Sequence, residues 1–159
     1  MLIYHPFEPV FDENSKILIL GSLPSVRSRA DGFYYGHPQN RFWRLMAKLF
    51  DEETPKTIDE KKAFLFRNGI ALWDVIASCE IENSADSTIR NAVPNDLSEI
   101  FKKADIRAVY TNGKTADKLY RKYNERKAVC LPSTSPANAA FSMEKLEAAW
   151  RVILQGKDF

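Results

Sequence analysis

The sequence predicts an α/β fold, a three-layer α/β/α sandwich built around a four-stranded parallel sheet. Two observations predict it. Short, continuous apolar runs recur along the chain, as in strands that are buried on both faces of a parallel sheet. Segments with apolar residues at helical spacing lie between these runs, so that strands and helices alternate.

Four segments are predicted to form the strands. The clearest is the apolar run Lys-Ile-Leu-Ile-Leu-Gly-Ser at residues 16–22, which includes a glycine near its end. Similar runs occupy residues 70–76, 106–112 and 127–131. The carboxyl ends of parallel strands share one edge of a sheet, where ligands bind in open α/β folds. We therefore expect the functional site where these four segments end.

Helical patterns fill the intervals between the strands. Thr57 and Glu60 form a capping box at the start of one helix, and Ser142 is a good cap for the last one. Asn95, which follows Pro94, is a candidate cap for a short helix. The predicted helices span residues 40–50, 57–67, 95–103, 114–123 and 142–155, and the polar segment 78–94 is predicted to be a long surface loop.

Length and composition are those of one globular domain, which we expect to span residues 1–159. Hydrophobic residues make up 45% of the chain and charged residues 28%, which excludes collagen-like and wholly disordered chains. The two cysteines, Cys79 and Cys130, are too few for a four-thiolate metal site and favour a reduced, cytoplasmic setting. No apolar run approaches the roughly 20 residues that cross a bilayer, and the first residues lack the pattern of a secretory signal, so no membrane association is expected.

The charge is unevenly distributed along the chain. The net charge is +2, but residues 102–127 contain nine basic and three acidic residues. A segment of this kind could face the phosphates of a nucleic acid. A solvated helix face is the alternative interpretation.

Several familiar catalytic patterns are absent from the sequence. It contains no G-x-G-x-x-G, Walker A, G-x-S-x-G or H-E-x-x-H pattern, which disfavours the corresponding nucleotide, serine-hydrolase and zinc-hydrolase sites. Residues 32–43 instead concentrate aromatic rings, amides and an imidazole, as a pocket for a planar heterocycle requires. Phe42 and Trp43 are expected to pack the following helix on the sheet. For Tyr34 and Tyr35 the sequence allows either core packing or contact with a ligand.

Three motifs resemble those of one known family. They read Gly-Ser-Leu-Pro-Ser at 21–25, Gly-His-Pro-Gln-Asn-Arg-Phe-Trp at 36–43 and Leu-Pro-Ser-Thr-Ser-Pro-Ala-Asn at 131–138. They are similar to motifs of the uracil-DNA glycosylase superfamily, above all of its hypoxanthine-DNA (deoxyinosine) glycosylase branch. The resemblance implies a uracil-DNA-glycosylase-like fold. It also implies an enzyme of base excision repair that hydrolyses the N-glycosidic bond of a deaminated base flipped out of DNA. Hypoxanthine is the base that the resemblance favours.

The resemblance also implies roles for individual residues. Mismatch-specific uracil enzymes carry a catalytic asparagine where this chain has Leu23, whereas the hypoxanthine branch uses the asparagine of H-P-x-N, which is Asn40. Tyr35 is expected to stack on the base, in a pocket formed by Gly21, Ser22, Leu23, Tyr35, His37 and Asn112. Contacts with DNA phosphates are expected from Ser25, Lys114, Ser133, Thr134 and Ser135. Superfamily members with an iron–sulfur cluster need four cysteines, so no cofactor and no metal is expected.

Other functions stay open on the sequence alone. A mismatch-specific uracil-DNA glycosylase is the nearest alternative, although Leu23 disfavours it. A non-catalytic nucleic-acid-binding module is a second, and a hydrolase of free nucleosides, which would need an acidic group such as Asp31 or Asp74, is a third. Trp73 is expected to pack, and His37 either shapes its turn or faces the pocket. DNA with a deaminated base is the expected partner, and the chain is expected to be a monomer.

Overall fold

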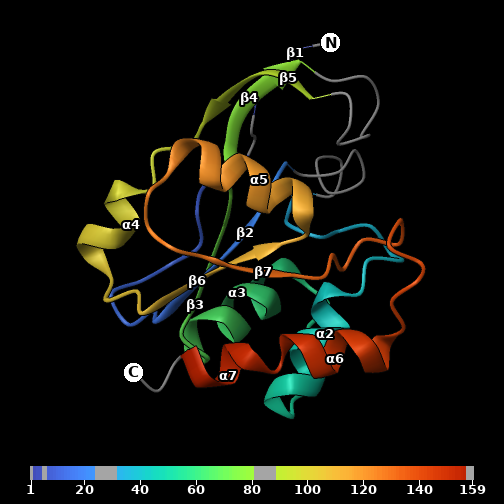
Figure 1. Cartoon of the computed structure of the whole chain (residues 1–159). Coiled ribbons are helices and arrows are strands. Elements are labelled where there is room, and N and C mark those ends of the chain that lie inside the picture. The colour runs from blue at the N-terminus through green and yellow to red at the C-terminus, as the bar shows by residue number, and fades with distance from the viewer. Residues whose placement is uncertain (1, 5–6, 24–31, 81–88, 157–159) are drawn as a thin grey trace.

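A computed structural model of the chain describes residues 2–4, 7–23, 32–80 and 89–156 (Figure 1). Its main sheet has four parallel strands in the order β3-β2-β6-β7. The strands are β2 (Ile17–Gly21), β3 (Ile70–Asp74), β6 (Ala108–Asn112) and β7 (Val129–Leu131). Each lies within a segment predicted to be a strand, so the four-stranded parallel sheet is confirmed.

Helices cover both faces of this sheet. In the described part of the chain they are α2 (Phe42–Phe50), α3 (Ile58–Arg67), α4 (Ser98–Lys103), α5 (Lys114–Tyr123), α6 (Met143–Trp150) and α7 (Val152–Gly156). Helices α2, α3, α6 and α7 lie on one face, and α4 and α5 lie on the other (Figure 1). The predicted three-layer sandwich is therefore confirmed.

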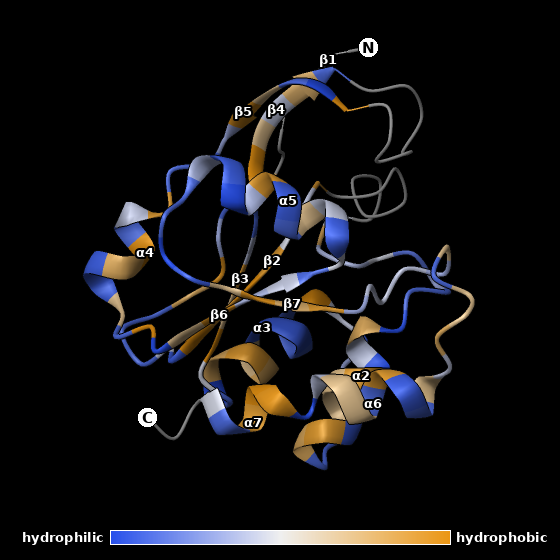
Figure 2. Cartoon of the chain, in the orientation of Figure 1, coloured by the Kyte–Doolittle hydropathy of each residue, from blue (hydrophilic) through white to orange (hydrophobic). Residues whose placement is uncertain are grey.

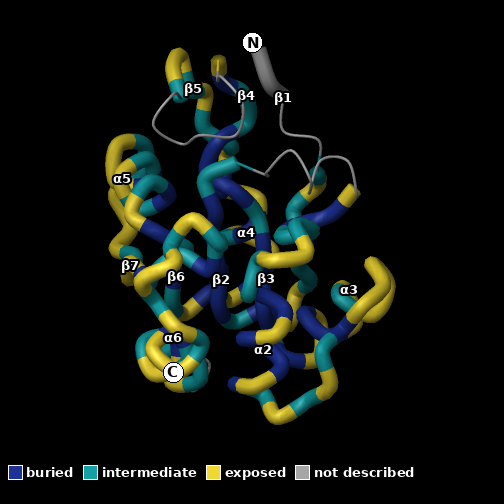
Figure 3. The backbone as a smooth tube through the Cα atoms, turned by 90° about the vertical axis from the view of Figure 1, so that its right-hand side faces the viewer, coloured by how far each residue is buried: buried dark blue, intermediate teal, exposed yellow. Residues whose placement is uncertain are grey.

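The central strand β2 contributes to an apolar core on each face. Ile17 and Ile19 belong to the core that includes α2, α3 and α6, whereas Leu18 and Leu20 belong to the core that includes α4 and α5. All four side chains are fully buried. The apolar and buried centre of the molecule is visible in Figure 2 and Figure 3. A strand covered on both faces needs an apolar run without alternation, which is the pattern of its sequence.

Two of the predicted helix starts are confirmed by their caps. Thr57 Oγ1 accepts from the backbone N–H three residues further on at 3.1 Å, and Ser142 Oγ does the same at 3.2 Å. Each side chain thereby satisfies an N–H that has no partner within its helix. The last predicted helix differs from the structure, because it is divided into α6 and α7 on either side of Arg151.

A second, antiparallel sheet is absent from the sequence prediction. Its strands are β1 (Leu2–Tyr4), β4 (Ile76–Glu80) and β5 (Arg90–Pro94), in the order β1-β4-β5. The surface loop predicted for residues 78–94 is therefore wrong at both of its ends, and residues 81–88 lie outside the described residues. The strand β4 pairs with β1 from the beginning of the chain, and no local pattern indicates so distant a pairing.

Asn95 ties this second sheet to the main one instead of capping a helix. Its side-chain amide donates to the carbonyl oxygen of Asp74 at 2.9 Å and to that of Ile76 at 3.2 Å. Helix α4 begins only at Ser98. The predicted cap is wrong because these two carbonyls hold the Asn95 side chain at the junction of β3 and β4, three residues before the helix begins.

We expect Leu18→Ala to lower the free energy of unfolding by about 2–5 kcal/mol, because the leucine is fully buried and its loss leaves a cavity. Val93→Ala is the control, since Val93 is 52% exposed and its truncation should cost less than about 0.5 kcal/mol. Denaturant unfolding followed by circular dichroism measures both changes. Equal losses in the two variants would contradict the burial of Leu18 between the sheet and α4.

Candidate active site

The carboxyl ends of the parallel strands bring the predicted site residues to one edge of the sheet. Gly21 ends β2 and lies beside Asp74, which ends β3. Asn112 ends β6 and lies beside Leu131, which ends β7. The loop after β7 and the segment that precedes α2 reach the same edge, where Thr134 of the loop contacts both Asn40 and Asn112. Ligands of open α/β sheets bind at this position.

A buried hydroxyl joins the two asparagines of the site. Thr134 Oγ1 donates to Asn40 Oδ1 at 2.9 Å and accepts from Asn112 Nδ2 at 3.0 Å. The Thr134 N–H donates to Asn112 Oδ1 at 3.0 Å, so Thr134 and Asn112 are paired twice. Because both ends of the Asn112 amide are bonded, its orientation is fixed. We refer to this arrangement of Asn40, Thr134 and Asn112 as the amide bridge.

Thr134 differs in this structure from the exposed phosphate contact that its polar motif predicts. Thr134 has no exposed surface, and its hydroxyl already serves as donor to Asn40 and as acceptor from Asn112. The motif at 131–138 identifies a residue of the site here but not its role. A threonine in a polar loop resembles a surface residue until the tertiary structure places two amides around it.

Asn40 presents its amide nitrogen to the site. Its Oδ1 accepts from Thr134 and from the Phe42 N–H, which is 2.9 Å away, and these two bonds use both lone pairs of the oxygen. The oxygen must face Phe42, because a backbone N–H can only donate. Within the described residues the Nδ2 protons make no hydrogen bond, and the side chain is half-buried. Asn40 therefore has donors to offer a ligand.

Arg41 holds the loop after β7 against the start of α2. Its guanidinium donates to the carbonyl oxygens of Ser135 and Asn138, each at 3.1 Å, and to that of Phe141. Its backbone N–H donates to the Thr134 carbonyl oxygen at 3.1 Å. Arg41 belongs to the motif at 36–43, but the motif does not predict its role. Its acceptors are backbone carbonyls about a hundred residues away, which no local sequence pattern can indicate.

The Tyr35 hydroxyl lies over Gly21 at the end of β2. A Cβ atom at position 21 would lie 3.0 Å from the Tyr35 oxygen and 2.3 Å from Asp74 Oδ1, so any larger residue would displace the Asp74 carboxylate. The Tyr35 ring stacks on Phe42 with 4.2 Å between the ring centroids. Burial, and next the charge of Asp74, raise the pKa of Tyr35, and the amide of Asn112 opposes this shift. The hydroxyl is therefore protonated at neutral pH and can donate.

A groove of about 590 Å³ opens beside Asn112, between the start of α5 and the loop after β7. Lys114, Ser133 and Ser135 line it, and Lys114 is exposed at the first position of α5. Ser133 Oγ accepts from the Ser135 N–H at 3.1 Å, and Ser135 Oγ accepts from the Ala137 N–H at 3.1 Å. Each hydroxyl keeps its own proton, so both serines can donate to an anion in the groove.

The other predicted site residues differ in where they lie and what they contact. Leu23 packs against the core that includes α4 and α5. The carbonyl oxygen of Ser22 accepts from the backbone of β4 at 3.2 Å. His37 shapes the turn before Asn40, since its Nδ1 accepts from the backbone two residues on at 3.0 Å. Trp73 packs against both cores, and Ser25 lies outside the described residues.

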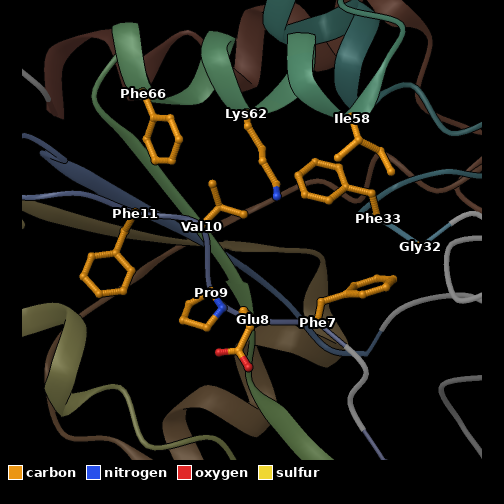
Figure 4. Close-up of a pocket in the computed structure, with 10 residues that line it drawn as sticks. All are labelled: Phe7, Glu8, Pro9, Val10, Phe11, Gly32, Phe33, Ile58, Lys62 and Phe66. Atoms are coloured by element: carbon orange, nitrogen blue, oxygen red, sulfur yellow. The ribbon is translucent and has the colours of Figure 1, made fainter.

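A second hollow, of about 300 Å³, lies along the edge of β3 and differs in chemistry from the amide bridge. Helix α3 and the segment 7–11 form its walls, with Ile58 and Phe66 projecting from the helix (Figure 4). Its lining is largely apolar and offers few groups that could recognise a base. Within residues 2–4, 7–23, 32–80 and 89–156, no cluster of histidine, cysteine or carboxylate ligands could hold a metal ion, and no helix is long and apolar enough to span a membrane.

Comparison with known proteins assigns the class that this fold and site define. The model of the uracil DNA glycosylase superfamily matches residues 8–154, so the chain belongs to this superfamily. A hypoxanthine DNA glycosylase of Methanosarcina acetivorans is 38% identical over 159 aligned residues, which cover 97% of this chain and 99% of the relative. A hypoxanthine DNA glycosylase of Methanosarcina barkeri is 40% identical over 110 residues, which cover 68% of this chain and 70% of that relative.

A solved structure supports the same family. It is a solution NMR structure of a Methanosarcina acetivorans protein that is provisionally assigned as a uracil DNA glycosylase. It is 36% identical in sequence, covers the whole of both chains and has a TM-score of 0.81. The family resemblance noted in the sequence and the fold that it implies are thereby confirmed.

We expect Thr134→Val to lower the free energy of unfolding by about 1–3 kcal/mol, because valine keeps the shape but removes the acceptor of Asn112 Nδ2 and one of the two donors to Asn40 Oδ1. Thr115→Val is the matched control at a half-buried position of α5 and should change stability by less than about 0.5 kcal/mol. Denaturant unfolding measures both. If Thr134→Val were no more destabilising than its control, the amide bridge would not hold the site together.

Proposed function

We propose that this protein is a DNA glycosylase that releases hypoxanthine from deoxyinosine in DNA and so begins base excision repair. Its kinship with the two Methanosarcina hypoxanthine DNA glycosylases supports the substrate. The amide bridge is the structural observation that carries the proposal, because it fixes two neutral side chains at the edge of the sheet where ligands bind. Rigid neutral hydrogen-bonding groups suit a flipped, uncharged base.

The reaction exchanges the bond between sugar C1′ and base N9 for a bond between C1′ and a water oxygen. In the transition state the sugar resembles an oxocarbenium ion, and the electrons of the broken bond move onto the departing base. The water then loses a proton and the base gains one, so that hypoxanthine leaves as a neutral molecule. Groups that donate hydrogen bonds to the base, or that hold the water in place, lower this barrier.

Asn40 is the proposed catalytic residue. Its oxygen is fully engaged by Thr134 and Phe42, so it acts through its amide N–H groups, which can donate to the departing base or to the oxygen of the attacking water. An amide held in advance needs no reorganisation when charge develops. Thr134 is a positioning residue in this scheme, and His37 positions Asn40 through the turn in which the Asn40 N–H donates to the His37 carbonyl oxygen at 2.9 Å.

The proposed base site lies against Gly21, Tyr35 and Asn112, and the proposed phosphate contacts lie in the neighbouring groove. Asn112 belongs to the amide bridge and also lines the groove, so it stands between the two. Lys114 supplies a positive charge there, and Ser133 and Ser135 supply hydroxyl donors. Side chains of this kind position a nucleic acid through its phosphates without reading its sequence.

We also propose that the chain works as a single domain over residues 1–159, as a monomer and in the cytoplasm. Cys79 and Cys130 form no disulfide, and Cys130 is exposed, which suits a reducing compartment. A monomer leaves the edge of the sheet open to a DNA duplex.

The proposed activity is tested with duplexes that carry deoxyinosine or deoxyuridine, followed by alkaline cleavage of abasic sites. We expect cleavage at deoxyinosine to exceed cleavage at deoxyuridine. Preference for deoxyuridine would replace the proposal by a uracil-DNA glycosylase. Binding of both duplexes without any base release would indicate a non-catalytic nucleic-acid-binding module.

We expect Asn40→Ala to slow base release by about 10²–10³-fold, the usual loss for one positioned donor, and to leave the fold intact. Asn14→Ala is the matched control. Asn14 is exposed and precedes β2, whereas the site lies where β2 ends. Single-turnover release of hypoxanthine measures the rates, and circular dichroism checks the fold. Wild-type rates in the Asn40 variant would remove this residue from the mechanism.

We expect Lys114→Gln to weaken DNA binding mainly at low salt. Loss of one phosphate contact should make the plot of log binding constant against log salt concentration shallower by about 0.9 on duplex DNA. Lys48→Gln is the control, since Lys48 is also exposed but lies on α2. Fluorescence anisotropy at several salt concentrations gives both slopes. Equal slopes for wild type and Lys114→Gln would exclude a phosphate contact by this lysine.

A further inference from the structure

Tyr35 combines two unfavourable features in one residue. Its backbone φ is 54°, in the left-handed region that favours glycine. Its hydroxyl is buried and its proton has no acceptor within the described residues, whereas the Asn112 amide interacts with the hydroxyl oxygen. A strained backbone persists only where the surrounding structure enforces it, and a buried unpaired polar atom in a native protein calls for a reason such as an absent ligand.

The position of the Tyr35 hydroxyl points to a ligand as that reason. In the described part of the chain, Tyr120 is the other residue with a buried, unpaired hydroxyl. Tyr120 lies in α5 and packs in the apolar core beneath that helix. The Tyr35 hydroxyl instead lies over Gly21, at the edge of the sheet where the amide bridge is built. This donor therefore lies at the edge of the sheet where ligands of this fold class bind.

Asp74 brings a hydrogen-bond acceptor to the same place. Its side chain is 2% exposed, and its Oδ1 occupies the space over Gly21 that a Cβ atom would fill. The charge of Asp74 adds to burial in raising the pKa of Tyr35, so the two groups lie within electrostatic reach of each other and the hydroxyl keeps its proton. One donor and one acceptor thus lie together in a region with little water.

We propose that Tyr35 and Asp74 read the N1–C6 edge of the flipped purine, with the Tyr35 hydroxyl donating to O6 and the Asp74 carboxylate accepting from N1–H. The inference rests on the proposed function and makes its base site specific. It gives the Tyr35 hydroxyl a role separate from ring stacking. Because both groups are buried, water competes weakly for these bonds, and a base that leaves them unpaired is strongly disfavoured.

The pair separates hypoxanthine from adenine, the base from which deamination produces it. Deamination replaces the 6-amino group by a carbonyl oxygen and places a proton on N1. Hypoxanthine therefore offers an acceptor to Tyr35 and a donor to Asp74. Adenine has a lone pair at N1, which the carboxylate repels. Guanine shares the N1–C6 edge of hypoxanthine and differs from it at C2. Tyr35 and Asp74 therefore do not distinguish hypoxanthine from guanine.

The test compares two bases within each protein preparation. Duplexes carry either deoxyinosine or the unsubstituted purine deoxynucleoside, whose base lacks both O6 and the N1 proton. Single-turnover base release is measured for the wild-type chain, Tyr35→Phe and Asp74→Asn. We expect the ratio of hypoxanthine release to purine release to fall about ten-fold or more in each variant, because each variant weakens a contact that purine never makes. The ratio does not depend on the folded fraction, since both rates come from one preparation.

Tyr120→Phe is the matched control, because it removes the other buried and unpaired hydroxyl and should leave the ratio unchanged. The proposal is overturned if both site variants keep the wild-type ratio, which would mean that the two residues support the structure without reading the base. It is also overturned if Tyr120→Phe lowers the ratio as much as Tyr35→Phe. Failure of the wild-type chain to release hypoxanthine would instead overturn the proposed function, so the two failures are distinguishable.

Discussion

One buried hydroxyl holds the edge of the sheet together. Thr134 is bonded to Asn40, 94 residues away, and to Asn112, 22 residues away. A buried polar group without a partner costs about 1–3 kcal/mol, so the loop after β7, the end of β6 and the start of α2 have one favourable arrangement and few alternatives. Arg41 reinforces it by donating to three carbonyl oxygens of the same loop. Gly21 and Asp74 lie at the same edge because β2 and β3 pair in parallel register.

The chemistry of the site follows from the groups that this constraint leaves available. The amide oxygens of Asn40 and Asn112 are engaged, and what Asn40 presents is an N–H donor. Asp74 is buried against Gly21, where its acceptor complements the hydroxyl of Tyr35. Such a set suits the proposed recognition of a flat base by its edge and the stabilisation of charge that moves onto it. It has little in common with the paired carboxylates of glycosidases that act on sugars.

Sequence patterns located the elements better than they located the roles. The four parallel strands lie within predicted segments, because a run such as Ile17 to Leu20 must be buried on both faces wherever it folds. The pairing of β1 with β4 is not predicted by any sequence pattern, because it joins two segments far apart in the chain. The same reason explains Arg41 and Thr134, whose motifs were recognised but whose partners are distant in sequence.

The sequence alone predicts the alternation of strands and helices, the parallel sheet and the residues at the strand ends, and it contains the family motifs. These features are local, because apolar periodicity, caps and motif letters act over a few neighbouring residues. The burial of Thr134, the engagement of the Asn40 oxygen, and the placement of the Tyr35 hydroxyl and the Asp74 carboxylate over Gly21 depend on tertiary structure. Hydrogen bonds and steric exclusion act through space, and they assign roles only once folding has brought distant residues together.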